Sequence, residues 1–396
     1  GNAYASSALS QSTAAAVDRG EKPAVPSAIA KYHCTEMACQ VAKDAMDIHG
    51  GKGVILGPRN YLGRGWQAAP ISITVEGANI MTRSLMIFGQ GAIRCHPWVL
   101  KEMQAAGLAD PVQRLKEFDV NLFGHIGFAF SNAVRSMFMG ISNSRFGEAP
   151  TSGITKRSYR KLNRYSANLA LVADTSMLLL GGKLKFKESL SGRLGDVLSQ
   201  LYIASAMLKR FEDEGRPATD LPLMAYAFND CVFKIERALS GALRNFPIRP
   251  AAWLLWLLVF PFGRRAQEPS DRLSHRAAAM LMSPSDARDR LGDGVFLTPC
   301  ANNPAGRINA ALSKVILAEP VERKFLKALK NADIEALTFN LQLDEGVREG
   351  WISAVERKQL EELQELTWDA ITVDDFDPSE LVAASSLKAK NMERAA

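Results

Sequence analysis

The sequence has few cysteines, little excess charge and no long hydrophobic run, and each shortage excludes a class of protein. Its 396 residues include five cysteines, an odd number without a CxxC pair, which speaks against a disulfide framework and a zinc ribbon. The longest apolar stretch, Ala251 to Phe262, is far shorter than the ~20 residues of a membrane-spanning helix. A net charge of +6 is compatible with acidic lipids, nucleotide phosphates or nucleic acid, and it selects none of them.

What is present is the composition of a folded protein. Hydrophobic residues make up 47% of the chain and charged residues 23%, and the length suggests two or three domains. The free cysteines fit a reducing, cytosolic compartment. The chain opens with Gly1 and a run of small residues that has neither a basic start nor an apolar signal core, so we interpret it as a piece of a longer protein.

No metal site or catalytic triad is expected. The pairs His33 with Cys34 and Cys95 with His96 lack the spacing of a tetrahedral metal site, and no nucleophile, histidine and acid follow one another in a recognisable order. A basic helix face at residues 156–164 is interpreted as solvated, with contacts to lipid or CoA phosphates as the alternative. Nucleic acid is not expected as a partner, because no recognisable nucleic-acid module accompanies these charges.

Helical periodicity dominates the chain. Apolar residues recur three or four positions apart from Ser27 to Gly50, which predicts a helix there, whereas residues 50–70 are rich in glycine and predict a loop. β-Branching predicts a short strand over 71–75, and Asn79 predicts the N-cap of a helix that continues to residue 88. Further helices are expected at 110–140, 156–180, 189–214, 221–243, 307–317 and 351–367. The proline-rich region 244–270 lacks this long periodicity, and residues 283–306 predict turns and loops.

One constellation stands out from this pattern. Glu76 lies in a VEGAN turn about 25 residues after an HGGKG loop that closes a helix. Taken alone, the carboxylate is best explained as a solvated group near a helix start, and Gly50 as a helix cap. However, three glycines in four positions exceed what a cap needs.

These motifs together resemble the C-terminal helical domain of the flavin-dependent acyl-CoA dehydrogenases. The segments DIHGGKG, NYLGRGWQ, ITVEGAN and FGQGAIRCHPWVLKEM, then LGGKLKFKESLSGRLGDVLSQLY and SPSDARDRLGDG, are similar to the large bacterial, FadE-type enzymes of fatty-acid β-oxidation. The resemblance implies a mainly α fold. Residues 1–96 would form a partial C-terminal helical bundle, residues 97–385 an appended, mostly helical extension, and residues 386–396 a frayed tail.

The resemblance also implies roles for particular residues. Glu76 matches the catalytic base, which removes the α-proton of an acyl-CoA while the β-hydride passes to FAD, and the product is a trans-2-enoyl-CoA. The resemblance gives FAD contacts to Gly50, Gly51, Gly53 and Gly77. It implies a medium- or long-chain acyl-CoA as substrate, an electron acceptor such as an electron-transfer flavoprotein, and a homo-oligomer.

The family's N-terminal helical domain and β-domain have no counterpart in these residues, so we expect the chain alone to be inactive or nearly so. Two interpretations of residues 250–265 stay open: a core helix, and a peripheral contact of a cytoplasmic bacterial enzyme with the inner membrane. Two rival functions also remain, a non-enzymatic helical scaffold at the membrane and an acyl-CoA oxidase.

Overall fold

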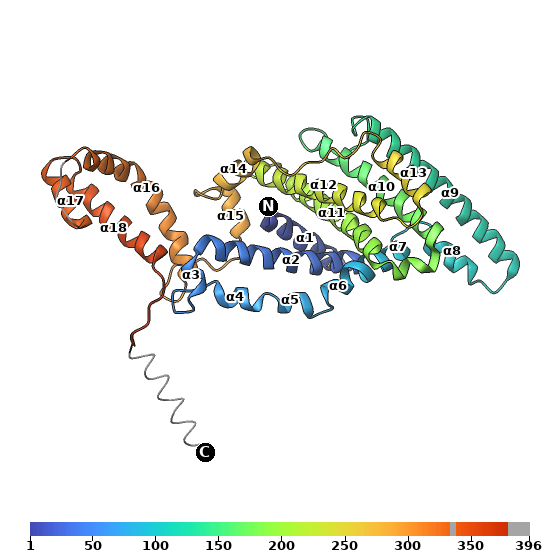
Figure 1. Ribbon diagram of the computed structural model, residues 1–396, viewed down its shortest axis with the longest axis horizontal. Helices are drawn as coiled ribbons and strands as arrows, with labels where there is room; N and C mark the ends of the chain where they lie inside the picture. The colour runs from blue at the N-terminus through green and yellow to red at the C-terminus, as the bar shows by residue number, and fades with distance from the viewer. Residues whose placement is uncertain (333–337, 379–396) are drawn as a thin grey trace, which may run out of the picture. The chain divides into compact units, whose positions relative to one another are not determined.

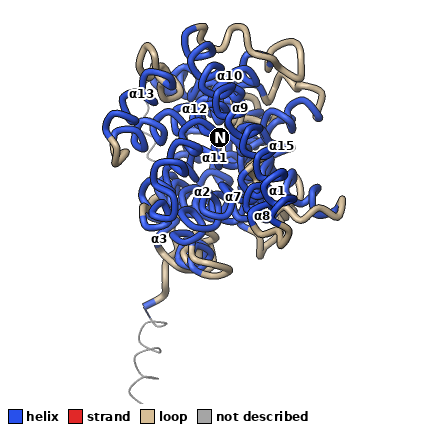
Figure 2. Tube along the Cα trace, turned by 90° about the vertical axis from the view of Figure 1, so that its right-hand side faces the viewer, coloured by secondary structure: helices blue, strands red, loops and turns tan. Residues whose placement is uncertain are grey.

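The computed structural model describes residues 1–332 and 338–378, and within these ranges the chain is helical, without a named strand (Figures 1 and 2). The mainly α fold expected from the sequence is confirmed. The tail predicted at 386–396 lies outside the described residues. No helix in the described part is both long and apolar enough to cross a bilayer.

The chain divides into two compact units, and each combines segments from early and late in the sequence. The first comprises Gly1–Ala38 and Ile71–Ala279, and the second comprises Cys39–Pro70 and Met280–Ala396. The first unit contains α1 (Asn2–Asp18), most of α2 (Ala24–His49), α5 (Ile71–Thr74), α6 (Asn79–Met81), the π-helix η1 (Thr82–Gln90), α7 (Gly91–Arg94), α8 (Val99–Ala106), α9 (Pro111–Ile141), α10 (Lys156–Leu180), the 3₁₀-helix η2 (Gly181–Phe186), α11 (Glu188–Asp213), α12 (Leu221–Arg244), α13 (Arg249–Val259) and α14 (Asp271–Ala279). The second contains the end of α2, α3 (Gly51–Val54), α4 (Gly63–Ala68), α15 (Asp286–Gly292), α16 (Pro304–Lys330), α17 (Phe339–Arg348) and α18 (Ala354–Ile371).

Helix α11 is the centre of the first unit. It packs against α12, η1, α10 and α1 (Figure 1). Its side chains are buried around most of its circumference. Glycine permits the closest approach: a Cβ at Gly195 would lie 2.7 Å from the carbonyl oxygen of Arg83 in η1. Because that neighbour is backbone, a larger residue at 195 would push η1 away from α11.

The second unit has a small core of its own. Phe325 of α16, Leu343 of α17 and Leu360 of α18 are fully buried within it. Helix α18 begins with a capping box, in which the Ser353 hydroxyl accepts from the Glu356 N–H and the Glu356 carboxylate accepts from the Ser353 N–H. These local interactions stabilise the start of α18. Near the other end of this helix, the Asp369 carbonyl accepts a hydrogen bond from Lys52 in the glycine-rich segment 50–70.

The helices predicted from apolar spacing are present, with boundaries shifted by a few residues except at α16, which is much longer than expected. The predicted strand at 71–75 is wrong: these residues form one helical turn in which the Val75 N–H donates to the Ile71 carbonyl at 3.0 Å. No partner strand exists in the described part of the chain, and β-branched residues without a ladder gain nothing from extension. Short helices also interrupt two of the predicted loops, namely α3 and α4 in 50–70 and α15 in 283–306, and α13 is the helix considered for residues 250–265.

Candidate active-site turn and glycine loop

Glu76 occupies a strained turn between α5 and α6. Its φ of 58° lies in the left-handed region, and Gly77 follows at 91°. A non-glycine residue in this conformation costs about 1–3 kcal/mol and persists only where the surroundings enforce it. The Glu76 side chain is exposed and has no hydrogen-bond partner among the described residues.

The surroundings that enforce this turn come from α2. The buried Asn79 side chain donates to the Thr35 hydroxyl and to Glu36 Oε1, each at 2.9 Å, and accepts from Lys31 Nζ at 2.6 Å. Lys31 also donates to the Gly77 carbonyl at 2.7 Å. Asn79 was predicted as a helix N-cap, and that prediction is wrong, since the N-cap position is Ala78 and the amide binds α2 instead.

The turn combines backbone N–H groups that have no acceptor among the described residues with exposed apolar side chains. The N–H groups of Glu76, Gly77 and Ala78 have no acceptor among the described residues, and successive free N–H groups in such a turn form an anion-binding concavity. Four exposed apolar side chains flank the turn in sequence: Ile71, Val75, Ile80 and Met81. This combination suits a ligand that has an oxyanion and an apolar chain.

Arg83, in the first turn of η1, forms an ion pair with Asp196 of α11. Its Nε and Nη2 donate to the two carboxylate oxygens of Asp196 at 2.7 and 2.6 Å, and these hydrogen bonds raise the pKa of the guanidinium. The bidentate pair fixes η1 to α11, and it thereby also fixes the position of the Glu76 turn, which is joined to η1 by α6.

The glycine loop lies in the second unit, after the end of α2. Gly50 has φ 55° and ψ −130°, a conformation open essentially only to glycine, and a Cβ at Gly53 would lie 3.2 Å from Met46 Sδ. The N–H groups of Gly51 and Lys52 have no acceptor among the described residues. Burial lowers the pKa of the Lys52 ammonium, which donates to the Asp369 carbonyl at 2.5 Å.

Two other residues support this loop, and sequence reasoning missed both. Asn60 Nδ2 donates to the carbonyls of Lys52 and Gly53 at 3.0 and 2.8 Å, while its Oδ1 accepts from the N–H groups of Leu62 and Gly63. Asp374 accepts from the N–H groups of Gly57 and Arg59 at 3.1 and 2.7 Å. No local signal reveals Asp374, because it lies more than 300 residues further along the chain.

His49, at the start of the HGGKG motif, is held on both ring nitrogens. Its Nδ1–H donates to the Ala45 carbonyl at 2.8 Å, and its Nε2 accepts from the Tyr61 hydroxyl at 2.5 Å. Both bonds are internal to the second unit. The ring therefore shapes the loop and leaves the glycine N–H groups as the polar atoms that a ligand would meet.

A histidine cluster in the first unit was not expected from the sequence. Ring and carboxylate atoms of His96, His125 and Asp174 lie within 4.8 Å of one another. His96 Nδ1 accepts from the N–H groups of Trp98 and Val99, so its proton is on Nε2, which donates to Asp174 Oδ1 at 2.9 Å. A protonated nitrogen offers no lone pair to a metal, and the cluster is best explained as a hydrogen-bond network that joins the connection between α7 and α8 to α9 and α10.

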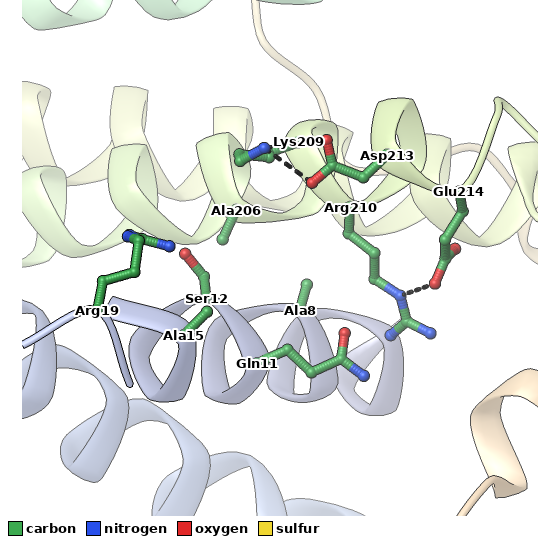
Figure 3. Close-up of a pocket in the computed structure, with 10 residues that line it drawn as sticks. All are labelled: Ala8, Gln11, Ser12, Ala15, Arg19, Ala206, Lys209, Arg210, Asp213 and Glu214. Carbon is green, nitrogen blue, oxygen red and sulfur yellow. Dashed lines mark hydrogen bonds and ion pairs between the residues drawn. The ribbon is translucent and has the colours of Figure 1, made fainter. Parts of the chain in front are cut away.

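A cavity of about 320 Å³ lies between α1 and α11 (Figure 3). Small side chains such as Ala8, Ala15 and Ala206 form its apolar part. Its three cations each form an ion pair, Arg19 with Glu21, Lys209 with Asp213 and Arg210 with Glu214. Figure 3 shows the last two of these pairs, and Arg210 Nη1 is buried without a hydrogen-bond partner among the described residues.

Comparison with models of protein families shows which family this chain belongs to. A family model described as acyl-CoA dehydrogenase, C-terminal, bacterial type, matches residues 93–376, and the general acyl-CoA dehydrogenase C-terminal domain model matches residues 2–88. The chain belongs to the acyl-CoA dehydrogenase family. The resemblance seen in the sequence is thereby confirmed, including its bacterial type.

Among solved structures, this member of the family is similar to an acyl-CoA dehydrogenase from Bacillus anthracis that was crystallised with FAD. The two are 16% identical with a TM-score of 0.46, and the match covers 65% of this chain. It covers 39% of the Bacillus anthracis chain, so the present chain spans well under half of that protein's length.

Proposed function

We propose that the whole protein is a FAD-dependent acyl-CoA dehydrogenase of fatty-acid β-oxidation, and that this chain supplies the catalytic base and part of the cofactor site. Its substrate is a medium- or long-chain acyl-CoA, which it oxidises to a trans-2-enoyl-CoA. The observation that carries the proposal is the turn at Glu76, where an exposed carboxylate, free N–H groups and apolar side chains occur together in a family member.

Glu76 is the base in this proposal. Its carboxylate takes the α-proton of the thioester, and the free N–H of Glu76 donates to the thioester oxygen, which bears the developing negative charge. The exposed apolar side chains around the turn bind the acyl chain and exclude water from the carboxylate. Lys31 and Asn79 keep the strained turn in place.

The glycine loop fits a pyrophosphate. The free N–H groups of Gly51 and Lys52 serve as donors, and Gly50 and Gly53 keep side chains out of the way, so these residues would hold the FAD phosphates. We also propose an FAD contact for Gly77, which has no side chain to obstruct the Glu76 turn. When bound, FAD supplies the acceptor for the β-hydride, and the electrons pass on to an acceptor such as an electron-transfer flavoprotein. We further propose that the enzyme is a homo-oligomer.

The test is the Glu76→Gln variant of the full-length protein. Mixed anaerobically with palmitoyl-CoA, the wild type should lose its flavin absorbance near ~450 nm, whereas the variant should retain FAD and bind acyl-CoA without bleaching. Glu268→Gln, an exposed carboxylate elsewhere in the chain, is the matched control and should bleach as the wild type does.

Three results would contradict the proposed function. Normal bleaching of Glu76→Gln would remove Glu76 as the base. A full-length protein that purifies without flavin would favour a helical scaffold. Peroxide formed in step with the enoyl product under air would identify an oxidase.

A further inference from the structure

Helix α9 presents a continuous apolar face to the outside of the first unit. Its opposite face packs on α8 and α10. The exposed apolar side chains follow helical spacing, so they lie along one stripe. They are Val112, Leu115, Val120, Phe123, Ile126, Phe130, Val134, Met137, Phe138 and Ile141, with exposed fractions from 44% to 76%.

The size of this stripe requires an explanation. From Val120 to Ile141 it extends for about 30 Å along the helix. Phe123 and Phe130, each about 70% exposed, lie two turns apart on it. Single exposed apolar residues are common on proteins, but contiguous patches of this extent mark a surface that binds a partner or a membrane.

Helix α13 continues the apolar surface. The end of α13 packs against α9 so closely that a Cβ at Gly140 would lie 2.9 Å from the ring of Pro261. One side of α13 is core, with Leu255 and Val259 buried. Its other side is exposed and bears Trp253, Leu254 and Leu257, with Phe262 just beyond the helix.

Buried hydrogen bonds hold α13 in this orientation. The Arg164 side chain is buried, contrary to the expectation of a solvated basic face, and its Nη2 donates to the Val259 carbonyl at 3.1 Å. The fully buried Glu236 carboxylate accepts from the Tyr165 hydroxyl at 2.8 Å and from the N–H groups of Arg265 and Ala266 at 2.9 and 2.8 Å. The exposed face of α13 is therefore a fixed surface.

Apart from Asp110, Glu117 and Asp119 near the start of α9, the charge around this surface has one sign. No acidic residue occurs from 120 to 147 or from 237 to 267. The same two stretches carry exposed arginines at 135, 145, 244, 249, 264 and 265. Within the described residues, Arg244, Arg249, Arg264 and Arg265 form no ion pair with a carboxylate, so their charges are available to an anionic partner.

We propose that the exposed faces of α9 and α13 form a docking surface for an anionic lipid bilayer. Aromatic and aliphatic side chains enter the interface, and the flanking arginines bind the lipid headgroups. The helices lie along the membrane and do not cross it. This surface extends the membrane contact suggested by residues 250–265 to the length of α9, and it is independent of the chemistry assigned to Glu76.

The arginines favour a bilayer over a second copy of the chain. In a two-fold symmetric pair, each face would meet its own image, which brings the unpaired arginines of both copies to the same interface. Like charges placed opposite one another cost several kcal/mol. An anionic membrane neutralises them.

The test is flotation of the full-length protein with vesicles. Wild-type protein should bind vesicles of phosphatidylglycerol and phosphatidylcholine at least tenfold more strongly than vesicles of phosphatidylcholine alone, and added salt should weaken this binding. Phe123→Ser combined with Phe130→Ser should reduce binding at least tenfold. Arg264→Gln combined with Arg265→Gln should remove most of the preference for anionic lipid.

The control is Val355→Ser in α18, which is 78% exposed and lies on a helix of the second unit that packs against α16 and α17. It should bind as the wild type does. Because all these side chains are exposed, the variants should keep the wild-type circular dichroism and flavin content. Equal binding of wild type and the double phenylalanine variant would overturn the proposal. So would a variant that changes the oligomeric mass while vesicle binding stays the same, since the face would then join protein copies.

Discussion

Replacing Asn79 with alanine tests whether α2 holds the Glu76 turn in its strained conformation. The change removes three hydrogen bonds, two from Nδ2 to Thr35 and Glu36 and one from Lys31 to Oδ1. Bonds with a charged partner contribute about 1.5–3 kcal/mol each and neutral ones about 1 kcal/mol. Glu36 is exposed and Lys31 half-buried, so water replaces part of what is lost, and we expect the free energy of unfolding to fall by about 2–3 kcal/mol.

The same change should reduce activity beyond its effect on stability. Without Asn79 and the positioning of Lys31, the Gly77 carbonyl and the left-handed Glu76 are free to relax, and a shift of about 1 Å in a catalytic group can cost 100-fold in rate. We expect flavin reduction by acyl-CoA in the full-length enzyme to slow by about 10–100-fold at a temperature where the variant is fully folded.

Stopped-flow flavin absorbance measures the rate, and a thermal melt measures the stability, with an expected decrease of roughly 4–12 °C in melting temperature. Asn121→Ala is the matched control, because Asn121 is a half-buried asparagine on α9 whose side chain donates to the carbonyl of Glu117, in its own helix. It should change neither quantity. A variant Asn79→Ala with wild-type stability and wild-type flavin reduction would refute the argument that α2 enforces the turn.

Two further predictions concern buried titratable groups. Burial lowers the pKa of His33 to about 4 from 6.5, so the unfolded state binds the extra proton, and stability should fall by up to about 3 kcal/mol as the pH drops from 6.5 to 4. Urea titrations across that range should show a shallower decline for His33→Leu, and an equal slope would contradict the assignment. Replacing Glu236 with alanine leaves the Tyr165 hydroxyl and two N–H groups without their acceptor and should cost about 3–5 kcal/mol, whereas Glu236→Gln should cost clearly less because the Tyr165 hydroxyl can rotate. Chemical denaturation of the two variants tests that order, and equal costs would show that the carboxylate is not the anchor of α13.

The sequence was most informative where structure depends on neighbours in the chain. Apolar spacing located α2 and α9 to α12 because helix formation and the burial of one helical face are set within a few turns. β-Branching at 71–75 misled, since propensity for a strand counts for little without a partner strand. Glu76 and the glycine loop were recognisable as motifs, and their roles in catalysis and FAD binding stay predictions.

The rest depended on contacts between distant parts of the chain. Asn79 looked like a helix cap because nothing nearby shows that Lys31 and Thr35 will face it. Arg164 looked like a solvated charge because its position under α13 is set by packing almost 100 residues later. Asp374 gave no signal at all, because its acceptor role depends on where α18 ends.

The hydrogen bonds that Asp374 accepts from the glycine loop also have a consequence for biosynthesis. The Gly57 N–H and the Asp374 carboxylate are 317 residues apart, as are Lys52 and the Asp369 carbonyl that it binds. At about 5–20 residues per second, a ribosome needs roughly 15–60 s to make the intervening chain. During that time the loop has been translated but lacks these hydrogen bonds, so a nascent chain would complete the support of its glycine loop only after Asp374 has emerged.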